Sequence, residues 1–400
     1  MRVSVKFILP LLLLCSCAKD RTYEYEEKTR GNHWMETAMQ EWYLWGDSLQ
    51  PLDWRQYFAA PATFVSRLIA QSKANDNWSF CSIDTVQTDN YPIGKVNRTN
   101  TYGIDYVLMN DPTGETTRQY ARVVTVFPGS PAMRCGLQRG DFIAQVGDEK
   151  ITRNVADRLL KGLERKLVVN RLGMDNSEGE IFWATVDTLN METSEAISIP
   201  AVMSCNMLTD DVAYIMLTSL ADYSSIESSL AQLLANSPAD LIVDLRLCNY
   251  GTLDCVLSVA NQIATTSGPF LRTVWNENKS NNNTTFNINA STGLHLFFIT
   301  SNYTCGAAEW LIYGLQTLQP SDVRVVGQTT AGQYVMLQAV PSDYYFTIYP
   351  AVAYVCNAEG DCNYKSGIAP DDEIDEVSYM WLFPYGDPRE VVIDFILENN

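Results

Sequence analysis

Residues 294–309 read LHLFFITSNYTCGAAE, and this stretch decides which fold the chain adopts. Its first part, Leu294–Thr300, is a short apolar run that is typical of a buried strand. The segment Ala307–Leu318 then carries apolar residues at helical spacing. The sequence therefore predicts a strand, a tight turn of small residues and a helix. Such a turn holds its side chains beside the free N–H groups at the start of the helix, where an enzyme can place a nucleophile.

The C-terminal half of the chain alternates between strand and helix patterns. Strands are predicted at Val212–Leu217 and Leu241–Leu245, with a helix at Ser224–Leu234 between them. This alternation predicts an α/β core with a central sheet flanked by helices. Nearer the N-terminus, apolar and aromatic residues at helical spacing predict helices at His33–Trp45 and Ala60–Ser72. The fold class is therefore a mixed α+β multidomain protein.

A second informative stretch covers residues 128–143, which read PGSPAMRCGLQRGDFI. Ser130 can cap a short helix that begins with Pro131, and Gly136 can end it in a left-handed conformation. This pattern resembles a PDZ domain, a β-rich module that binds a peptide as an added strand. The resemblance implies that peptide or protein C-termini are partners. It also implies a carboxylate-binding loop made of Tyr102, Gly103, Ile104 and Asp105.

The turn after Thr300 resembles the Thr-Ala-Ser-Ala-Ser-Glu motif of carboxy-terminal processing (tail-specific) serine peptidases. Thr304 and Glu309 match the motif, but Gly306 stands where the resemblance places the nucleophilic serine. The family's general base is a lysine in a Thr-x-Gly-Lys turn, and here Gln333 occupies that position. A glutamine amide cannot take up a proton near neutral pH. The resemblance thus implies a protease fold whose hydrolytic activity is lost or impaired.

A third departure lies near Asp244-Leu245-Arg246, which resembles the family's oxyanion-hole segment. The family follows this phrase with a run of glycines, whose backbone N–H groups face the substrate carbonyl. Here only Gly251 remains as an oxyanion remnant, and Tyr250 replaces a glycine. The phrase Asp76–Phe80 resembles one in Bacteroidetes-type members of the family, and Ser366–Asp371 resembles the Gly-Ile-x-Pro-Asp closing phrase of these peptidases.

Other hypotheses remain open from the sequence. The chain could be an active serine-type peptidase, or one whose nucleophile has moved to Cys305. No lysine occurs between Lys279 and Lys365, so a shifted alignment does not supply the missing base. A histidine-dependent triad would have to use His33 or His295. The PDZ module could also serve only to pack against the core, which would make the protein a structural component of the cell envelope.

The amino-acid composition limits the classes of partner and cofactor that the protein is expected to bind. The formal net charge is −19, from 47 acidic and 28 basic residues. Such a charge repels phosphate backbones, so no nucleic-acid partner is predicted. The spacing of cysteine and histidine residues suggests no zinc site. No metal or other cofactor is expected. Among the ten cysteines, Cys248/Cys255 and Cys356/Cys362 are close enough to pair locally, but sequence alone does not fix the pairing.

The N-terminus resembles a bacterial lipoprotein signal, because a basic start and an apolar run precede Leu14-Cys15-Ser16-Cys17. Cys17 is the predicted lipidation site, and an ordinary secretory signal is the alternative. The predicted domains are residues 1–16 (signal peptide), 17–95 (tether and helical segment), 96–200 (PDZ-like domain and linking strands) and 201–400 (protease-like core). Ala18–Arg30 is predicted to be the tether. The predicted location is the bacterial cell envelope, with the lipid holding the protein to a membrane on the outer-membrane or periplasmic side.

Overall fold

The structure is a computed structural model, and it describes residues 22–83, 96–174, 181–290 and 292–399. The predicted signal peptide and Cys17 lie outside these residues, so both stay predictions. Within the described part of the chain, no helix combines the length and the apolar content needed to cross a membrane.

The helices and strands have the following bounds. The α-helices are α1 (Thr22–Trp42), α2 (Pro61–Ile69), α3 (Pro131–Arg134), α4 (Arg153–Ala156), α5 (Tyr223–Leu234), α6 (Leu253–Ile263), α7 (Ala307–Leu318) and α8 (Val391–Glu398). The 3-10 helices are η1 (Gly46–Ser48), η2 (Trp54–Phe58), η3 (Ala70–Ser72), η4 (Asp157–Leu159), η5 (Glu277–Asn282) and η6 (Glu376–Ser378). The strands are β1 (Phe80–Ile83), β2 (Ile104–Asn110), β3 (Gln119–Val126), β4 (Phe142–Val146), β5 (Glu149–Lys150), β6 (Arg165–Met174), β7 (Ile181–Met191), β8 (Val202–Met207), β9 (Val212–Leu217), β10 (Asp240–Asp244), β11 (Gly268–Trp275), β12 (Thr284–Ile288), β13 (His295–Thr300), β14 (Val323–Gly327), β15 (Val335–Leu337), β16 (Val340–Pro341), β17 (Phe346–Tyr349), β18 (Ala351–Asn357) and β19 (Asp372–Glu373).

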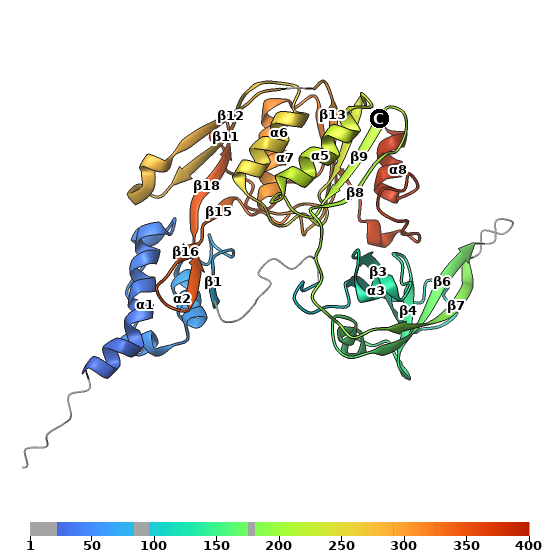
Figure 1. Cartoon of the computed structure of the whole chain (residues 1–400), viewed down its shortest axis with the longest axis horizontal. Helices are drawn as coiled ribbons and strands as arrows, with labels where there is room; N and C mark the ends of the chain where they lie inside the picture. Colours follow the sequence, from blue (N-terminus) through green and yellow to red (C-terminus); the bar gives the residue numbers. More distant parts are fainter. Residues whose placement is uncertain (1–21, 84–95, 175–180, 291, 400) are drawn as a thin grey trace, which may run out of the picture.

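Three modules are visible in Figure 1. Helices α1 and α2 lie at one end, the sheet that begins with β2 lies at the other, and the α/β core lies between and above them. The first module shares one hydrophobic cluster with the core, because Met35 and Phe64 are buried with the residues of α6 and α7. The PDZ-like module has a separate core around Ile104 and Val169. The N-terminal helices are therefore part of the core body, while the PDZ-like module is a distinct unit.

The central sheet of the core has the order β19-β14-β13-β10-β9-β8. The strands from β19 to β9 pair in parallel, and β8 runs antiparallel to β9 at the edge. Parallel strands covered on both faces read as continuous apolar runs, as Val212–Leu217 does. Helices α5, α6 and α7 pack on one face, and α8 packs on the other. The predicted α/β core is confirmed.

The PDZ-like module has a sheet of order β2-β3-β4-β6-β7. The Ser130 side chain accepts a hydrogen bond from the N–H of Met133, and Pro131 begins α3, as predicted. Gly136 has a φ of 88°, a left-handed conformation that ends the helix. The capping residues therefore predicted the start and the end of this short helix correctly.

Two segments differ from the predictions. Ala18–Arg30 was expected to be a tether, but α1 already begins at Thr22. Its glutamates and lysine are good helix formers, and Glu24 and Lys28 are spaced four residues apart, where opposite charges support a helix. The asparagine tract at residues 281–283 has a composition that predicts a flexible insertion. Instead it ends η5, and Thr284–Ile288 follows it as a strand paired with β11.

The C-terminal segment joins the PDZ-like module to the core through buried charges. Arg139, beside β4, donates to Glu376 at 2.8 Å, and Arg246, after β10, donates to Glu390 at 2.9 Å. Arg246 also bonds Glu376, so the four side chains form one interdomain ion cluster. Burial alone would raise the pKa of Glu376, but the two guanidinium groups outweigh it and hold that pKa well below its usual range. Arg122 adds hydrogen bonds to the backbone carbonyls of residues 377, 379 and 380.

Replacing Arg139 with alanine should loosen the PDZ-like module from the core. Removing one partner of a buried ion pair leaves the remaining charges uncompensated, at a cost of about 3–5 kcal/mol in the free energy of unfolding. The matched control is Arg158→Ala, which removes a pair exposed to solvent with Glu149 and should cost at most about 1 kcal/mol. Chemical denaturation of both variants measures the difference, and equal losses would contradict the prediction.

Candidate functional site

The site centres on the turn between β13 and α7, where Gly306 precedes the first helical residue. Its backbone has φ 61° and ψ −118°. A left-handed residue normally has a ψ of +30° to +60°, so this conformation is one that only glycine adopts without strain. Thr304 holds the turn, because its Oγ1 donates to the carbonyl of Leu245 at 2.8 Å and accepts from the N–H of Ser301 at 3.0 Å. The strand, turn and helix were all predicted correctly.

Glu309 ties this turn to the second one. Its fully buried carboxylate accepts hydrogen bonds from the N–H of Gly306 at 2.9 Å, Gly332 at 2.6 Å and Gln333 at 2.7 Å. The Thr330 hydroxyl donates a fourth hydrogen bond. Burial raises the pKa of Glu309 to about 7, although the four donors favour the charged form. One carboxylate thus positions both segments that the family resemblance singled out.

Gln333 lies directly beside Gly306, the position predicted for the nucleophile. A Cβ atom built on Gly306 would stand 3.1 Å from the Gln333 Oε1 atom and 3.5 Å from its Nε2 atom. The same amide donates a long hydrogen bond, at 3.4 Å, to the carbonyl of Val335. The structure therefore brings together the two positions predicted for nucleophile and base. Glycine and glutamine fill them, so neither an attacking oxygen nor a proton-accepting amine is present at either position.

Cys305 is also in this turn, but its thiol faces away from solvent. Its Sγ lies 3.5 Å from the carbonyl oxygen of Asn249, and its N–H donates to the carbonyl of Cys248 at 3.1 Å. Burial, followed by the charge of Glu309, raises the pKa of Cys305 to about 12. Since the thiolate is the nucleophilic form, this environment leaves the thiol unreactive at neutral pH.

Gly251 lies against the start of α7. A Cβ atom on this residue would stand 2.6 Å from the Ala307 Cβ and 2.7 Å from the Leu220 carbonyl oxygen. Only glycine allows this approach, so Gly251 lies beside the turn, and its role as an oxyanion remnant stays a prediction. The two turns and this segment enclose a cavity of about 230 Å³. Its lining residues are Asn249, Tyr250, Gly251, Thr252, Gly306, Ala307, Trp310, Gln333, Leu337, Ala339 and Tyr349.

The predicted carboxylate-binding loop of the PDZ-like module lies elsewhere. Tyr102, Gly103, Ile104 and Asp105 are all buried. The N–H of Tyr102 donates to the carbonyl of Leu160, and that of Gly103 donates to the Thr101 hydroxyl. Ile104 and Asp105 are not in a loop, because β2 already begins at Ile104. This strand lies at the edge of its sheet, where a peptide strand can be added. A role of these four residues in binding a C-terminus stays a prediction.

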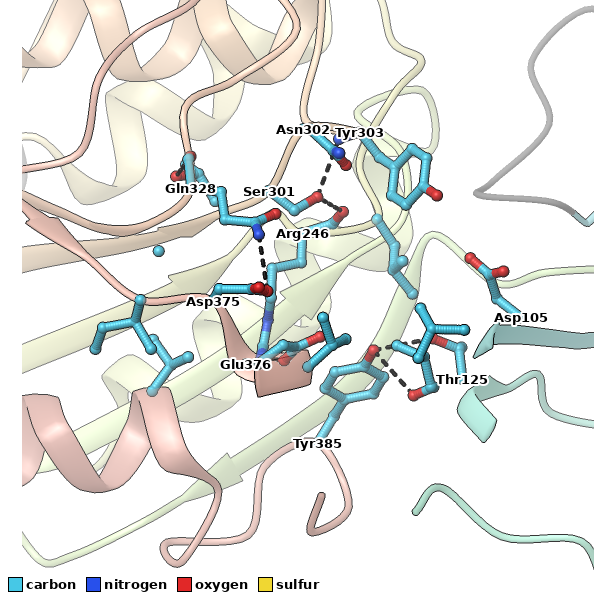
Figure 2. A pocket seen from close by; sticks show the side chains of 18 of the residues that line it. Asp105, Thr125, Arg246, Ser301, Asn302, Tyr303, Gln328, Asp375, Glu376 and Tyr385 are labelled. Carbon is cyan, nitrogen blue, oxygen red and sulfur yellow. Dashed lines mark hydrogen bonds and ion pairs between the residues drawn. The ribbon is translucent and has the colours of Figure 1, made fainter. Parts of the chain in front are cut away.

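A second cavity, of about 200 Å³, lies between the PDZ-like module and the core. Figure 2 shows Asp105 and Thr125 on one side of it and Arg246, Ser301 and Gln328 on the other. Its lining includes residues 300–303, whereas Gly306 and Ala307 line the first cavity. The two cavities therefore lie along the same strand–turn–helix segment.

Neither His33 nor His295 lies at the site around Gly306. His33 stacks on Tyr57 in the N-terminal module, with ring centroids 4.2 Å apart. His295 begins β13, at the opposite end of that strand from the turn, and its Nδ1 lies 3.1 Å from Asp240. A histidine-dependent triad at Gly306 is therefore not assembled.

Sequence reasoning missed two features of the site. It identified Glu309 only as a match to the family motif, whereas its carboxylate anchors both turns. It also missed Leu337, Ala339 and Tyr349 as walls of the cavity, because these residues follow the second turn without a recognisable motif. The match of Glu309 to the family motif was the only signal that pointed to its larger role.

These features define a peptidase-like α/β protein with a PDZ-like module. Family models agree with that class: Peptidase family S41 matches residues 211–374, PDZ domain matches 122–171, and Peptidase S41 N-terminal domain matches 30–80. The chain belongs to peptidase family S41 and carries the family's N-terminal domain and a PDZ domain.

Individual relatives support the same family. The carboxy-terminal processing protease CtpA of Bacillus subtilis (strain 168) is 25% identical over 273 residues, which cover 66% of this chain and 55% of CtpA. The chain thus matches little more than half the length of this curated relative. A crystal structure described as an S41 protease of Bacteroides fragilis superposes with a TM-score of 0.79 at 24% identity, covering 92% of this chain and 96% of the other. The photosystem II D1 C-terminal processing protease superposes with a TM-score of 0.52 at 16% identity, over 92% and 97%. These two structures show a shared fold.

Replacing Gly306 with alanine should destabilise the core by about 1–3 kcal/mol, because a non-glycine residue in this sparsely populated conformation is strained. The matched control is Gly129→Ala. Gly129 also has a positive φ, of 68°, but nothing lies within 4 Å of the added Cβ. Thermal denaturation of both variants is the measurement, and a smaller loss at Gly306 than at Gly129 would contradict the strain.

Glu309→Gln should remove a pH-dependent part of the stability. The pKa of Glu309 is raised to about 7 in the folded state, so the folded state binds its proton more tightly than the unfolded state does. This contribution is fully present below about pH 4.5, is lost as the pH rises to about 7, and amounts to about 3 kcal/mol. The stability difference between the wild type and Glu309→Gln should shrink across this window. A difference that stays constant from pH 5 to 8 would contradict the assignment.

Proposed function

We propose that this protein is a lipid-anchored envelope protein that binds peptide or protein C-termini and does not hydrolyse them. The observation that carries this proposal is the pair Gly306 and Gln333, which lie side by side where a peptidase needs a nucleophile and a base. The surrounding turn keeps its shape, so a polypeptide can be held there without being cleaved.

Lys279 and Lys365 are the nearest lysines in sequence on either side of the two turns, and neither supplies a base. The Lys279 amine pairs with Glu41, and the Lys365 amine donates to the backbone carbonyl of Ala74. The Glu309 carboxylate reaches the site, but four donors already occupy it. A general base must lie within hydrogen-bond reach of the proton that it removes. These contacts favour a binding role over catalysis.

Binding would use two surfaces. The edge strand β2 can accept a peptide as an added strand, with backbone hydrogen bonds supplying affinity. Another part of the same bound peptide would lie in the cavity beside Gly306, in contact with Tyr250 and Trp310. CtpA is named as a carboxy-terminal processing protease, and this supports C-termini as the partner class. The anchor rests on the lipoprotein-like sequence that ends at Cys17.

A peptidase that depends on Cys305 is the competing function. The buried thiol, with its pKa of about 12, argues against it. A purely structural role is the third possibility, and it requires that no peptide binds. The three functions predict different outcomes in one experiment.

The experiment compares the wild type with the double variant Gly306→Ser/Gln333→Lys and with Cys305→Ala. Each protein is incubated with a library of peptide C-termini and, separately, with a fluorophosphonate that labels activated serines. We expect the wild type to bind peptides without cleaving them or reacting. The double variant should gain labelling, because the retained turn places the new side chains beside each other.

Each alternative has its own signature in the same assay. Hydrolysis by the wild type that disappears in Cys305→Ala would establish the relocated nucleophile. Labelling or hydrolysis by the wild type that persists in Cys305→Ala would establish another active residue. The absence of any peptide binding by the wild type would leave only the structural role.

A further inference from the structure

An exposed aromatic patch lies on the N-terminal module, far in sequence from the cavity beside Gly306. It consists of Tyr25 on α1 and Trp54 and Phe58 on η2. Their exposed fractions are 51%, 65% and 41%, large values for aromatic side chains. The Phe58 ring contacts both of the others edge to face, with centroids 5.9 Å from Tyr25 and 6.3 Å from Trp54. The three rings border a hollow of about 360 Å³.

The patch is held rigidly by polar contacts beneath it. The Asn32 amide, buried in α1, donates to the carbonyls of Tyr57 and Ala59, at 2.8 Å each. The Tyr57 hydroxyl donates to Glu36 at 2.7 Å, and the Asp53 side chain accepts from the N–H of Arg55. These bonds fix η2 against α1. The aromatic side chains are therefore presented outward by a built surface, and not by a loose loop.

The place of the patch in the chain indicates what covers it. Helix α1 begins at Thr22, five residues after Cys17. A fully extended chain of five residues spans at most about 18 Å. If the acyl chains attached to Cys17 enter a bilayer, the start of α1 must lie within that distance of the lipid. Tyr25 lies less than one helical turn further on, and Tyr23, which is also exposed, lies closer still.

Tyrosine and tryptophan are the side chains enriched at membrane–water interfaces, because their rings are apolar and their polar tips stay hydrated. We infer that the patch of Tyr25, Trp54 and Phe58 rests in the headgroup region of the membrane that holds the lipid anchor. The inference depends on the lipid anchor in the proposed function, but not on peptide binding. The patch would hold the body of the protein in one orientation on the membrane.

The charges near the patch indicate which lipid headgroups it would contact. Four carboxylates near the patch slightly outnumber three cations: Glu24, Glu26, Glu27 and Asp53 against Lys28, Arg30 and Arg55. Glu26 borders the hollow, and the Arg55 guanidinium lies 5.4 Å from the centroid of the Trp54 ring. An anionic surface would repel these carboxylates. The contact should therefore form on zwitterionic phosphatidylethanolamine and weaken as anionic phosphatidylglycerol is added.

The test uses the full-length acylated protein in phosphatidylethanolamine vesicles. The photoreactive residue benzoylphenylalanine replaces Trp54 in one variant and Leu163 in the control. Leu163 is 75% exposed and belongs to the PDZ-like module. Illumination should give several-fold more lipid adduct at position 54 than at position 163, and added phosphatidylglycerol should reduce it. Far-UV circular dichroism spectra and thermal denaturation midpoints that match those of the wild type verify that both variants are folded.

Mass spectrometry of the N-terminal peptide separates the possible failures. Acylated protein with equal or no lipid adduct at the two positions would overturn the patch contact and leave the anchor intact. An adduct at position 54 to a second copy of the chain would also overturn it. Protein without acyl chains would remove the anchor, and the inference with it, whereas the peptide-binding assay would still decide the rest of the proposed function.

Discussion

The arrangement of the site depends on one buried carboxylate. Glu309 accepts hydrogen bonds from residues on both sides of the cleft, and so fixes the turn at Gly306 relative to the turn at Gln333. Removing this acceptor would leave four buried donors unpaired, and each buried polar group without a partner costs about 1–3 kcal/mol. That penalty is independent of catalysis. The shape of the cleft therefore does not depend on which residue lies at the position predicted for the nucleophile.

Gly306 and Gln333, at the positions predicted for the nucleophile and the base, both lower the free-energy cost of that shape. A serine in the conformation of Gly306 stores backbone strain of about 1–3 kcal/mol, whereas glycine adopts it freely. A lysine at position 333 would have to place its charge next to buried groups. The glutamine amide fills similar space without a charge, so it avoids the desolvation penalty. Both residues avoid a cost in stability that an active site would carry, which agrees with the proposal that this protein does not hydrolyse peptides.

The sequence predicted what local patterns determine and missed what distant residues determine. Helix α7 and strand β9 have the predicted bounds, and the helix cap was predicted from Ser130 and Pro131 alone. The sequence left two local cysteine pairings open. The structure contains the Cys356–Cys362 disulfide, whereas Cys248 and Cys255 are free thiols. The interdomain ion cluster could not be found in this way. Arg139 and Glu390 are 251 positions apart, and nothing in the neighbourhood of either residue indicates its partner.

The segment Asp244-Leu245-Arg246 shows why some motif residues persist beside others that have changed. The Arg246 side chain belongs to the interdomain ion cluster, its carbonyl accepts from the Ser301 hydroxyl at 2.6 Å, and Asp244 accepts from the Tyr214 hydroxyl at 2.8 Å. The carbonyl of Leu245 holds Thr304 in the turn. These three residues therefore support both the domain arrangement and the cleft. The family's glycines that follow serve mainly to bring N–H groups to a substrate carbonyl, and here Asn249 and Tyr250 replace them. The proposed loss of catalysis would free the positions that contact substrate, while the positions that hold the fold together keep their residues for structural reasons alone.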